Sequence, residues 1–288
     1  MSAATLEIGG LAFRLEGGDG VERAMHLPGM AAFVANGGGT MLTMTMDADC
    51  GMPADGRVLH TFAILENTAE CRFEVDAEGV YRYVFSTGGV LRIDPRRDGH
   101  AECTAIGSPD VLRFAIWLAY GMMAARHGRL PIHASAVVHR GSAVLCLGES
   151  GTGKSTHTRL WLNNIPHCHL LNDDSPIVAV TTREVVAYGS PWSGKSHCYR
   201  AESHPVAAFL RLEQRPRNAI RRLPTLEAFG AVQPSLPPAM SHDEHLLDMQ
   251  ADIASGILST TPVYRLGCRP DADAARLSHN TIYGNDND

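Results

Sequence analysis

The segment Ala143-Val-Leu-Cys-Leu-Gly-Glu-Ser-Gly-Thr-Gly-Lys-Ser-Thr156 organises the rest of this chain. Four of its residues match the phosphate-loop pattern G-x-x-x-x-G-K-[ST]: Gly148, Gly153, Lys154 and Ser155. An apolar run precedes the loop and a helix-compatible stretch follows it, which is the strand–loop–helix order that the motif needs. The segment therefore predicts a loop that binds a nucleoside triphosphate or a close relative.

Each part of the predicted loop has a physical task. Glycines let consecutive backbone N–H groups turn inward around a phosphate, and the helix N-terminus adds a partial positive charge. We expect Lys154 to reach the β- and γ-phosphates and the Ser155 hydroxyl to ligate Mg²⁺. The alternative is a glycine-rich turn that binds nothing. The predicted nucleotide-binding residues are Gly148, Glu149, Ser150, Gly151, Thr152, Gly153, Lys154, Ser155 and Thr156.

Composition excludes several classes of protein. The 288 residues carry a formal net charge of −6 with no basic arm, which argues against nucleic acid as a partner, and no apolar run is long enough to cross a membrane. The first residues lack the layout of a signal peptide, and the seven cysteines are scattered without a C-x-x-C pair. We therefore expect a cytoplasmic protein with reduced thiols. The histidines show no metal-ligand spacing, and the run His167-Cys168-His169 is interpreted as a chance feature of a loop.

Residues 1–107 form a predicted β-rich N-terminal module. Short alternating runs are separated by glycine-containing turns, which is typical of an antiparallel meander or a small sandwich. No catalytic group of residues is recognisable there, so a scaffold or a lid over the substrate is the default role. The runs are 11–15, 41–46, 58–65, 71–75, 81–85 and 90–93.

Residues 108–288 form the second predicted domain. Ser108-Pro-Asp begins a helix, because it supplies an N-cap residue, a proline in the first turn and an acid near the positive end of the helix dipole. Two strands, 130–139 and 142–147, then form a hairpin that leads into the phosphate loop. The run 170–180 predicts a strand, an acidic turn and a second strand.

Three features around the loop carry a family resemblance. His133 lies fifteen residues before Gly148, Asp173-Asp174 lie about twenty after Lys154, and the glycine-rich segment 189–194 follows. Over roughly residues 130–215 this layout resembles the C-terminal kinase domain of HPr kinase/phosphorylase, which has a phosphoenolpyruvate-carboxykinase-like fold. The resemblance implies an α/β (α+β) fold whose phosphate loop sits on a mixed or antiparallel sheet, with ATP and Mg²⁺ as cofactors.

The two adjacent aspartates suit phosphoryl transfer. Moving a phosphoryl group onto a hydroxyl needs positioning, charge neutralisation and a base for the acceptor proton. By resemblance Asp173 is the base and Asp174 holds Mg²⁺ together with Ser155, although the sequence alone leaves the order of the two aspartates open. The alternative is an Asn-Asp-Asp-Ser-Pro turn whose aspartates are solvated.

Two further residues are candidate catalytic groups beside Asp173 and Lys154. His133 either faces the substrate or the γ-phosphate, or is a satisfied histidine of the core. Lys195 either neutralises charge on the transferring phosphoryl group or is an exposed loop lysine. HPr kinase has a glutamate-bearing metal signature near this point, and Glu184 is out of register with it. A basic run could clamp a phosphate or form a solvated face: Arg215, Arg217, Arg221 and Arg222.

The sequence thus predicts an ATP-dependent phosphotransferase. The acceptor is a serine-like hydroxyl on a peptide, a small protein or a small molecule. A homo-oligomer is one expectation from the resemblance. Two alternatives stay open: a nucleotide-dependent carboxylase or decarboxylase like phosphoenolpyruvate carboxykinase, and a non-catalytic nucleotide-sensing module.

Overall fold

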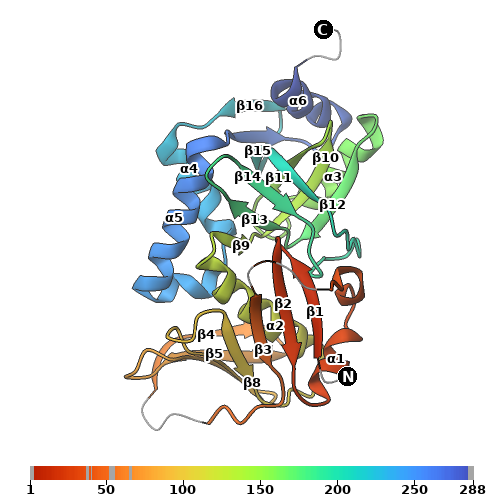
Figure 1. Ribbon diagram of the computed structural model, residues 1–288. Coiled ribbons are helices and arrows are strands. Elements are labelled where there is room, and N and C mark those ends of the chain that lie inside the picture. The colour runs from red at the N-terminus through yellow and green to blue at the C-terminus, as the bar shows by residue number, and fades with distance from the viewer. Residues whose placement is uncertain (1–2, 37–38, 40, 52–55, 65–66, 285–288) are drawn as a thin grey trace. The chain divides into compact units, whose positions relative to one another are not determined.

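The computed structural model describes residues 3–36, 39, 41–51, 56–64 and 67–284 (Figure 1). Both sheets are mixed, so the fold is α/β in the broad sense. Where the sequence analysis placed a domain boundary between residues 107 and 108, the compact units of the structure divide between His127 and Gly128. The first unit consists of Met1–His127 and Ala239–Leu247, and the second of Gly128–Pro238 and Asp248–Asp288.

The first unit is built on an eight-stranded sheet. The predicted strand runs all appear in it, except that residue 65 lies outside the described part of the chain. The expected antiparallel meander is correct from β4 to β8 and wrong beyond it, because β3 lies between β2 and β8 and is parallel to both. Across the sheet the strands are β1 (Ala3–Ile8), β2 (Leu11–Glu16), β3 (Met41–Thr45), β8 (His100–Cys103), β7 (Val90–Ile93), β6 (Tyr81–Phe85), β5 (Ala69–Val75) and β4 (Arg57–Ile64).

Helix α2 (Pro109–Ala125) supplies much of the core of this unit. The Ser108 hydroxyl caps it by accepting the N–H of Val111, as the Ser-Pro-Asp start predicts. Most of its side chains are buried, and it packs against β3, β7 and β8. The apolar surface of α2 is therefore the reason that it belongs to the first unit. The shorter helices here are α1 (Gly20–Met25), η1 (Met30–Phe33) and η3 (Pro238–His242).

The second unit contains the phosphate-loop segment on a nine-stranded sheet. Strands β11, β15 and β17 are parallel, while β10 lies between β11 and β12 and is antiparallel to both. The predicted hairpin into the loop is confirmed as β10–β11. The strands are β12 (His169–Asp174), β10 (Ala134–His139), β11 (Ser142–Leu147), β15 (Ser203–Gln214), β14 (Val185–Tyr188), β13 (Ile177–Val180) and β9 (Arg129–Pro131), with β17 (Val263–Cys268) pairing β15 and β16 (Ala219–Arg222).

The run 130–139, expected as one strand, is two strands in different parts of this sheet. Strand β9 pairs with β13, and β10 pairs with β11 and β12. Between them the chain leaves the ladder, since His133 N–H donates to Ser235 O at 2.7 Å. His133 therefore lies just before the first residue of β10. This is the edge of the sheet at which β11 ends and the phosphate loop begins.

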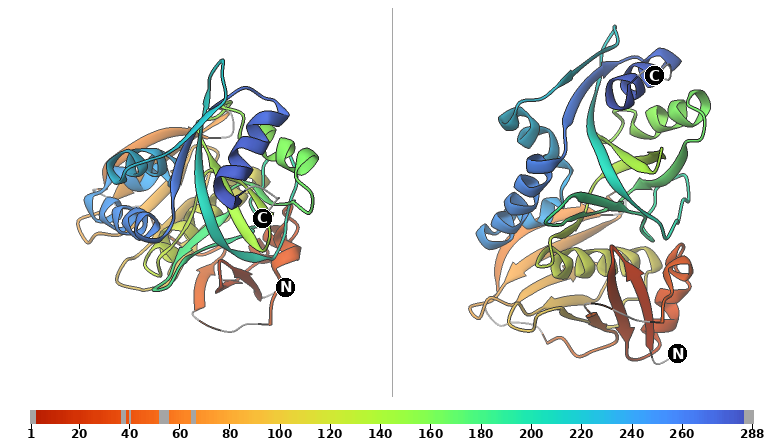
Figure 2. Two further views of the ribbon diagram at one scale, coloured as in Figure 1. Left: turned by 90° about the horizontal axis from the view of Figure 1, so that it is seen from above. Right: turned by 45° about the horizontal axis from the view of Figure 1, so that its top comes forward.

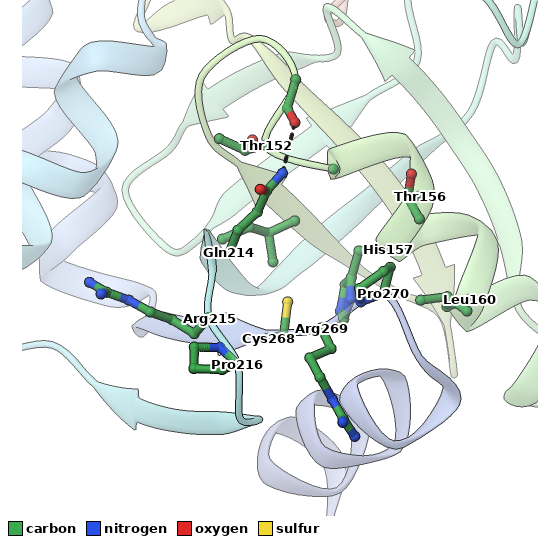
Figure 3. Close-up of a pocket in the computed structure, with 13 residues that line it drawn as sticks. Thr152, Thr156, His157, Leu160, Gln214, Arg215, Pro216, Cys268, Arg269 and Pro270 are labelled. Atoms are coloured by element: carbon green, nitrogen blue, oxygen red, sulfur yellow. Dashed lines mark hydrogen bonds between the residues drawn. The ribbon is translucent and has the colours of Figure 1, made fainter.

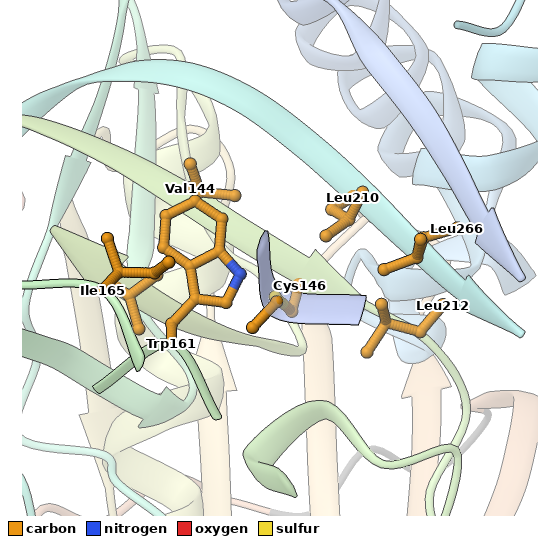
Figure 4. Close-up of a cluster of buried hydrophobic side chains, with 9 residues drawn as sticks. Val144, Cys146, Trp161, Ile165, Leu210, Leu212 and Leu266 are labelled. Atoms are coloured by element: carbon orange, nitrogen blue, oxygen red, sulfur yellow. The ribbon is translucent and has the colours of Figure 1, made fainter. Parts of the chain in front are cut away.

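Helices α3 (Lys154–Asn164) and α6 (Ala272–Tyr283) lie side by side over one face of the second sheet (Figures 1 and 2). Trp161 of α3 is fully buried against sheet residues such as Val144, Cys146 and Leu210 (Figure 4). Its Nε1–H donates to Ser278 Oγ of α6 at 2.9 Å. Burying an indole contributes on the order of 2–3 kcal/mol, so this contact anchors the helix that follows the loop. The remaining helices of the second unit are α4 (Thr225–Val232), η2 (Gln233–Ser235) and most of α5 (Glu244–Thr260).

Candidate functional site

The loop 148–153 connects β11 to α3, as the motif predicted. Gly148 has φ 155°, and a Cβ there would stand 2.3 Å from Thr152 Oγ1, so only glycine fits at the end of β11. Thr152 closes the turn, because its N–H and its hydroxyl both donate to Glu149 O, at 3.2 and 2.8 Å. The loop is therefore a tight backbone turn in which steric constraints explain the glycines.

Lys154 is folded back over this loop. Its Nζ donates to Gly148 O at 2.8 Å and to Glu149 O at 3.2 Å. Partial burial lowers the pKa of Lys154, and the nearby carboxylates of Asp174 and Glu149 oppose that effect. The ammonium is thus held at the loop by neutral carbonyl oxygens, which bind it more weakly than a phosphate would.

Strand β15 fixes the loop from the other side. Arg211 pairs with Glu149 at 2.7 Å, and Gln214 Nε2 donates to Gly151 O at 3.1 Å. The hydrogen bond and charge of Arg211 lower the pKa of Glu149, whose side chain is exposed. Glu149 therefore has a positioning contact that ties the loop to β15.

The register of the sheet brings three candidate residues to one edge. Ala134 of β10 pairs with Leu147 on one side and with Asp174 on the other. His133, Gly148 and Asp174 consequently lie at the same edge, and His133 Nε2 is 3.8 Å from Asp174 Oδ1. Burial and the charge of Lys154 lower the pKa of His133, while Asp174 opposes them, and the lowered pKa favours the neutral imidazole. His133 is 45% exposed, which disagrees with the core-histidine alternative.

Asp173 is buried and held by hydroxyl groups. Only 5% of the residue is exposed, so the interpretation of both aspartates as solvated turn residues does not hold for it. Ser135 Oγ donates to Asp173 Oδ1 at 2.9 Å, and Ser196 Oγ donates to Asp173 Oδ2. Thr158 Oγ1 of α3 lies 2.9 Å from Ser135 Oγ. Both carboxylate oxygens of Asp173 therefore accept hydrogen bonds from neutral hydroxyls, and the hydroxyl of Ser196 lies on a loop.

Asn172 builds the turn that separates the two aspartates. It is fully buried, and its Oδ1 accepts the N–H groups of Asp174 and Ser175 at 3.1 and 2.9 Å. Its Nδ2 donates to Ser190 and to Trp192 O. This one amide thus turns Asp174 outward, where its carboxylate is 52% exposed, while Asp173 remains inside.

Lys195 lies on a turn that is built on Asp173. Gly194 N–H donates to Asp173 O at 2.8 Å, and a Cβ at Gly194 would stand 2.6 Å from that oxygen. Ser196, on the other side of Lys195, bonds the carboxylate. Lys195 is exposed. Lys154 and Lys195 are the only two lysines of the chain, so every other basic side chain apart from the histidines is an arginine.

A cavity of about 540 Å³ lies beside the loop (Figure 3). Thr152 and Thr156 border it from the loop and α3, Leu212 from β15, and Arg215 and Arg269 from the ends of β15 and β17. Arg215, from the predicted basic run, therefore reaches this cavity, whereas Arg221 of the same run pairs with Glu227 on α4. The volume is in the range of small-ligand pockets.

Several residues of the site were not predicted because no sequence motif marks them. Ser135, Ser196 and Asn172 contact the aspartates, and Arg211 holds the loop, but none belongs to a recognisable motif. Only Asn172 had a local signal, since it precedes the aspartates in a run of turn-forming residues. Ser155, the predicted Mg²⁺ ligand, is exposed in the first turn of α3, and Ser150 is exposed at the tip of the loop.

Comparisons with known proteins add little to this geometry. No protein-family model matches the chain, and no curated protein matches it. Among solved structures, it is similar to the Hpr(Ser) kinase/phosphatase from Coxiella burnetii, with 13% identity and a TM-score of 0.32 over 54% of this chain and 93% of that one. Similarity at this level carries no argument about fold or function. Among the helices that the structure describes, none has the length and apolarity needed to cross a membrane.

Proposed function

We propose that this protein is an ATP-dependent phosphotransferase that phosphorylates a serine-like hydroxyl. The observation that carries the proposal is the hydrogen bond from Ser196 Oγ to the buried carboxylate of Asp173, one strand position from the edge where the phosphate loop begins. A hydroxyl that donates to a carboxylate beside bound phosphates is the geometry that general-base activation of an acceptor requires.

The loop supplies the phosphate site. The loop leads into the N-terminus of α3, whose partial positive charge favours a phosphate. The carbonyl bonds of Lys154 are ones that a triphosphate would replace with stronger, charge-assisted bonds. Lys195, on the turn next to Asp173, would neutralise charge on the group in transfer. The nucleoside would occupy the cavity that Thr156 and Arg215 border.

The donor set at the edge fits Mg²⁺. A half-exposed carboxylate, Asp174, and the exposed Ser155 hydroxyl are hard oxygen ligands, and Mg²⁺ prefers such oxygens together with several waters. Bound there, the ion would offset charge on the β- and γ-phosphates. Asp173 keeps a different role in this proposal, because burial and two hydroxyl donors leave it oriented towards an acceptor hydroxyl.

The two lysines make the nucleotide site directly testable. An acyl-phosphate derivative of ATP acylates a lysine amine that lies beside its phosphates, and peptide mapping identifies the modified residue. We expect acylation of Lys154, abolished by excess ATP and Mg²⁺ and absent in Lys154→Arg. Lys195→Arg is the matched control, in which the Lys154 modification should persist. Equal acylation of both lysines that ATP does not prevent would contradict the nucleotide site.

Transfer is tested separately from binding. We expect ADP to form from ATP and Mg²⁺ faster when a degenerate serine-peptide library or a panel of small polyhydroxy compounds is present. Protected acylation of Lys154 with no acceptor-stimulated ADP formation would support a nucleotide-sensing module instead. Nucleotide-dependent release of CO₂ from oxaloacetate would support the carboxykinase alternative.

A further inference from the structure

A second group of chemically active side chains lies on the same sheet, away from the phosphate loop. His169 begins β12, His204 lies near the start of β15, and Glu202 directly precedes β15. Their ligand atoms all lie within 4.8 Å of one another, and among the described residues no other group of His, Cys, Asp and Glu ligand atoms meets that condition. No sequence motif marks the three residues, because 33 positions separate His169 from Glu202.

The two imidazoles face one carboxylate oxygen. His169 Nε2 is 3.0 Å and His204 Nε2 is 3.5 Å from Glu202 Oε2. Arg200 Nη1 bonds the other oxygen, Oε1, at 3.1 Å. Arg200 therefore orients the carboxylate so that one oxygen, Oε2, faces both rings. This orientation suits coordination of an ion by Glu202 through a single oxygen.

The second nitrogen of His204 decides what can lie between the rings and Glu202. His204 Nδ1 is 3.4 Å from the carbonyl oxygen of Gly141, and a carbonyl can only accept. This contact favours a proton on Nδ1, and in a neutral ring of that tautomer Nε2 presents a lone pair to the carboxylate oxygen of Glu202. A cation is then needed between these two acceptors, and it is either the second proton of an imidazolium or a metal ion. A backbone carbonyl that fixes the distal N–H is also the usual support of a metal-bound histidine.

We propose that His169, Glu202 and His204 bind one divalent transition-metal ion of the Zn²⁺ type. Two imidazole nitrogens and one carboxylate oxygen are a frequent zinc donor set, whereas Mg²⁺ and Ca²⁺ prefer oxygen ligands alone. Bonds of about 2.0–2.2 Å in a tetrahedron place ligand atoms roughly 3.3–3.5 Å apart, close to the 3.0 and 3.5 Å observed. The three side chains are 21–38% exposed, so an ion has access and water can fill a fourth position.

The ion would act as a clip on the segment that carries Lys195. That segment leaves β14 at Gly189 and returns at Glu202, where Gly189 N–H donates to Glu202 O at 3.0 Å. A Cβ at Gly189 would stand 1.8 Å from Arg200 O, so the two ends of the segment are already in close contact. Binding to both His169 and His204 would join β12 to β15 across this point and restrict the segment.

Metal titration tests the site without reference to catalysis. The full chain, prepared without a histidine tag and stripped of metal, is titrated with Zn²⁺ alone and with Co²⁺ alone by calorimetry. We expect one ion per chain in the wild type and at least a hundredfold loss of affinity in H169N/H204N. His245→Asn, at an exposed histidine of α5, is the matched control and should bind as the wild type does.

Further variants distinguish binding at this site from binding by the neighbouring thiol and from a loss of affinity caused by misfolding. Cys168→Ser should keep the ion, since the neighbouring thiol is not among the proposed ligands. Glu202→Gln keeps the size of the side chain and should lose affinity. Zn²⁺ should slow amide hydrogen exchange over 189–202 in the wild type and not in H169N/H204N. Wild-type affinity in H169N/H204N, no stoichiometric binding by the wild type, or loss of binding in C168S would each overturn the proposal.

Discussion

Each sheet buries an aspartate, and the partners of the two aspartates differ. Asp94 in the first unit is 7% exposed and accepts from Arg96 at 2.9 Å, with Arg92 nearby at 3.4 Å. Asp173 in the second unit is 5% exposed and accepts from the hydroxyls of Ser135 and Ser196. An arginine neutralises a carboxylate permanently, whereas a serine hydroxyl on a loop can be exchanged for another hydroxyl. The same residue type is therefore structural in one sheet and available for chemistry in the other.

Replacing each aspartate by asparagine should separate the two roles most strongly. We expect Asp173→Asn to lower acceptor-dependent ADP formation by roughly 10³-fold, because general-base catalysis contributes about 10²–10⁴-fold. Nucleotide protection of Lys154 should be kept, since Asp173 does not touch the loop. Asp94→Asn should leave ADP formation unchanged. If both variants turned over ATP equally, the contrast between the two sheets would be lost.

Acid should destabilise the second unit first, through His157. Burial lowers the pKa of His157 to about 4, and its Nε2 accepts from Trp161 Nε1 at 3.2 Å. The unfolded chain takes up a proton near pH 6.5, so stability is full above that pH and falls until about pH 4. The loss is at most about 3.4 kcal/mol, from a pKa shift of about 2.5.

Hydrogen exchange of the β11 amides at pH 7 and pH 4.5 measures the effect of His157. His157→Gln should flatten the dependence, because the amide oxygen can still accept from Trp161 and carries no titrating group. His245→Gln, at an exposed histidine, is the control and should keep the wild-type dependence. An unchanged pH dependence in His157→Gln would assign the acid sensitivity to another group.

The fold was predictable where local patterns dominate and not where distant strands meet. The motif located the turn from β11 into α3, and the pattern of the run 170–180 placed both aspartates at the end of a strand, which is β12. The parallel position of β3 between β2 and β8 depends on long-range pairing that alternation does not encode. Likewise, the hydroxyl of Ser196 reaches Asp173 because Asn172 and the Gly194 N–H tie the two segments together.

The turn that carries Lys195 should be sensitive to one methyl group. Gly194→Ala would place a Cβ 2.6 Å from Asp173 O, so the backbone must shift and move Lys195 and Ser196. Since a displacement of 1 Å can cost about 10²-fold, we expect ADP formation to fall by roughly 10- to 10²-fold. Gly230→Ala in α4 meets no atom within 4 Å and should instead stabilise the chain by about 0.5–1 kcal/mol. Normal turnover in Gly194→Ala would mean that this turn is not part of the site.

The smallest expected effect concerns Asp94 at low pH. The hydrogen bond from Arg96 lowers the pKa of Asp94 to about 2, against the opposing effect of burial. Its contribution to stability is present above about pH 4 and is lost as the pH falls to 2. Because the arginines are partly solvated, we expect about 1–2 kcal/mol. Hydrogen exchange of the β7 amides should therefore change between pH 4 and pH 2 in the wild type and much less in Asp94→Asn. A change in β7 between pH 6.5 and pH 4 instead would mean that the two units share one acid response, which contradicts the separate roles of Asp94 and His157.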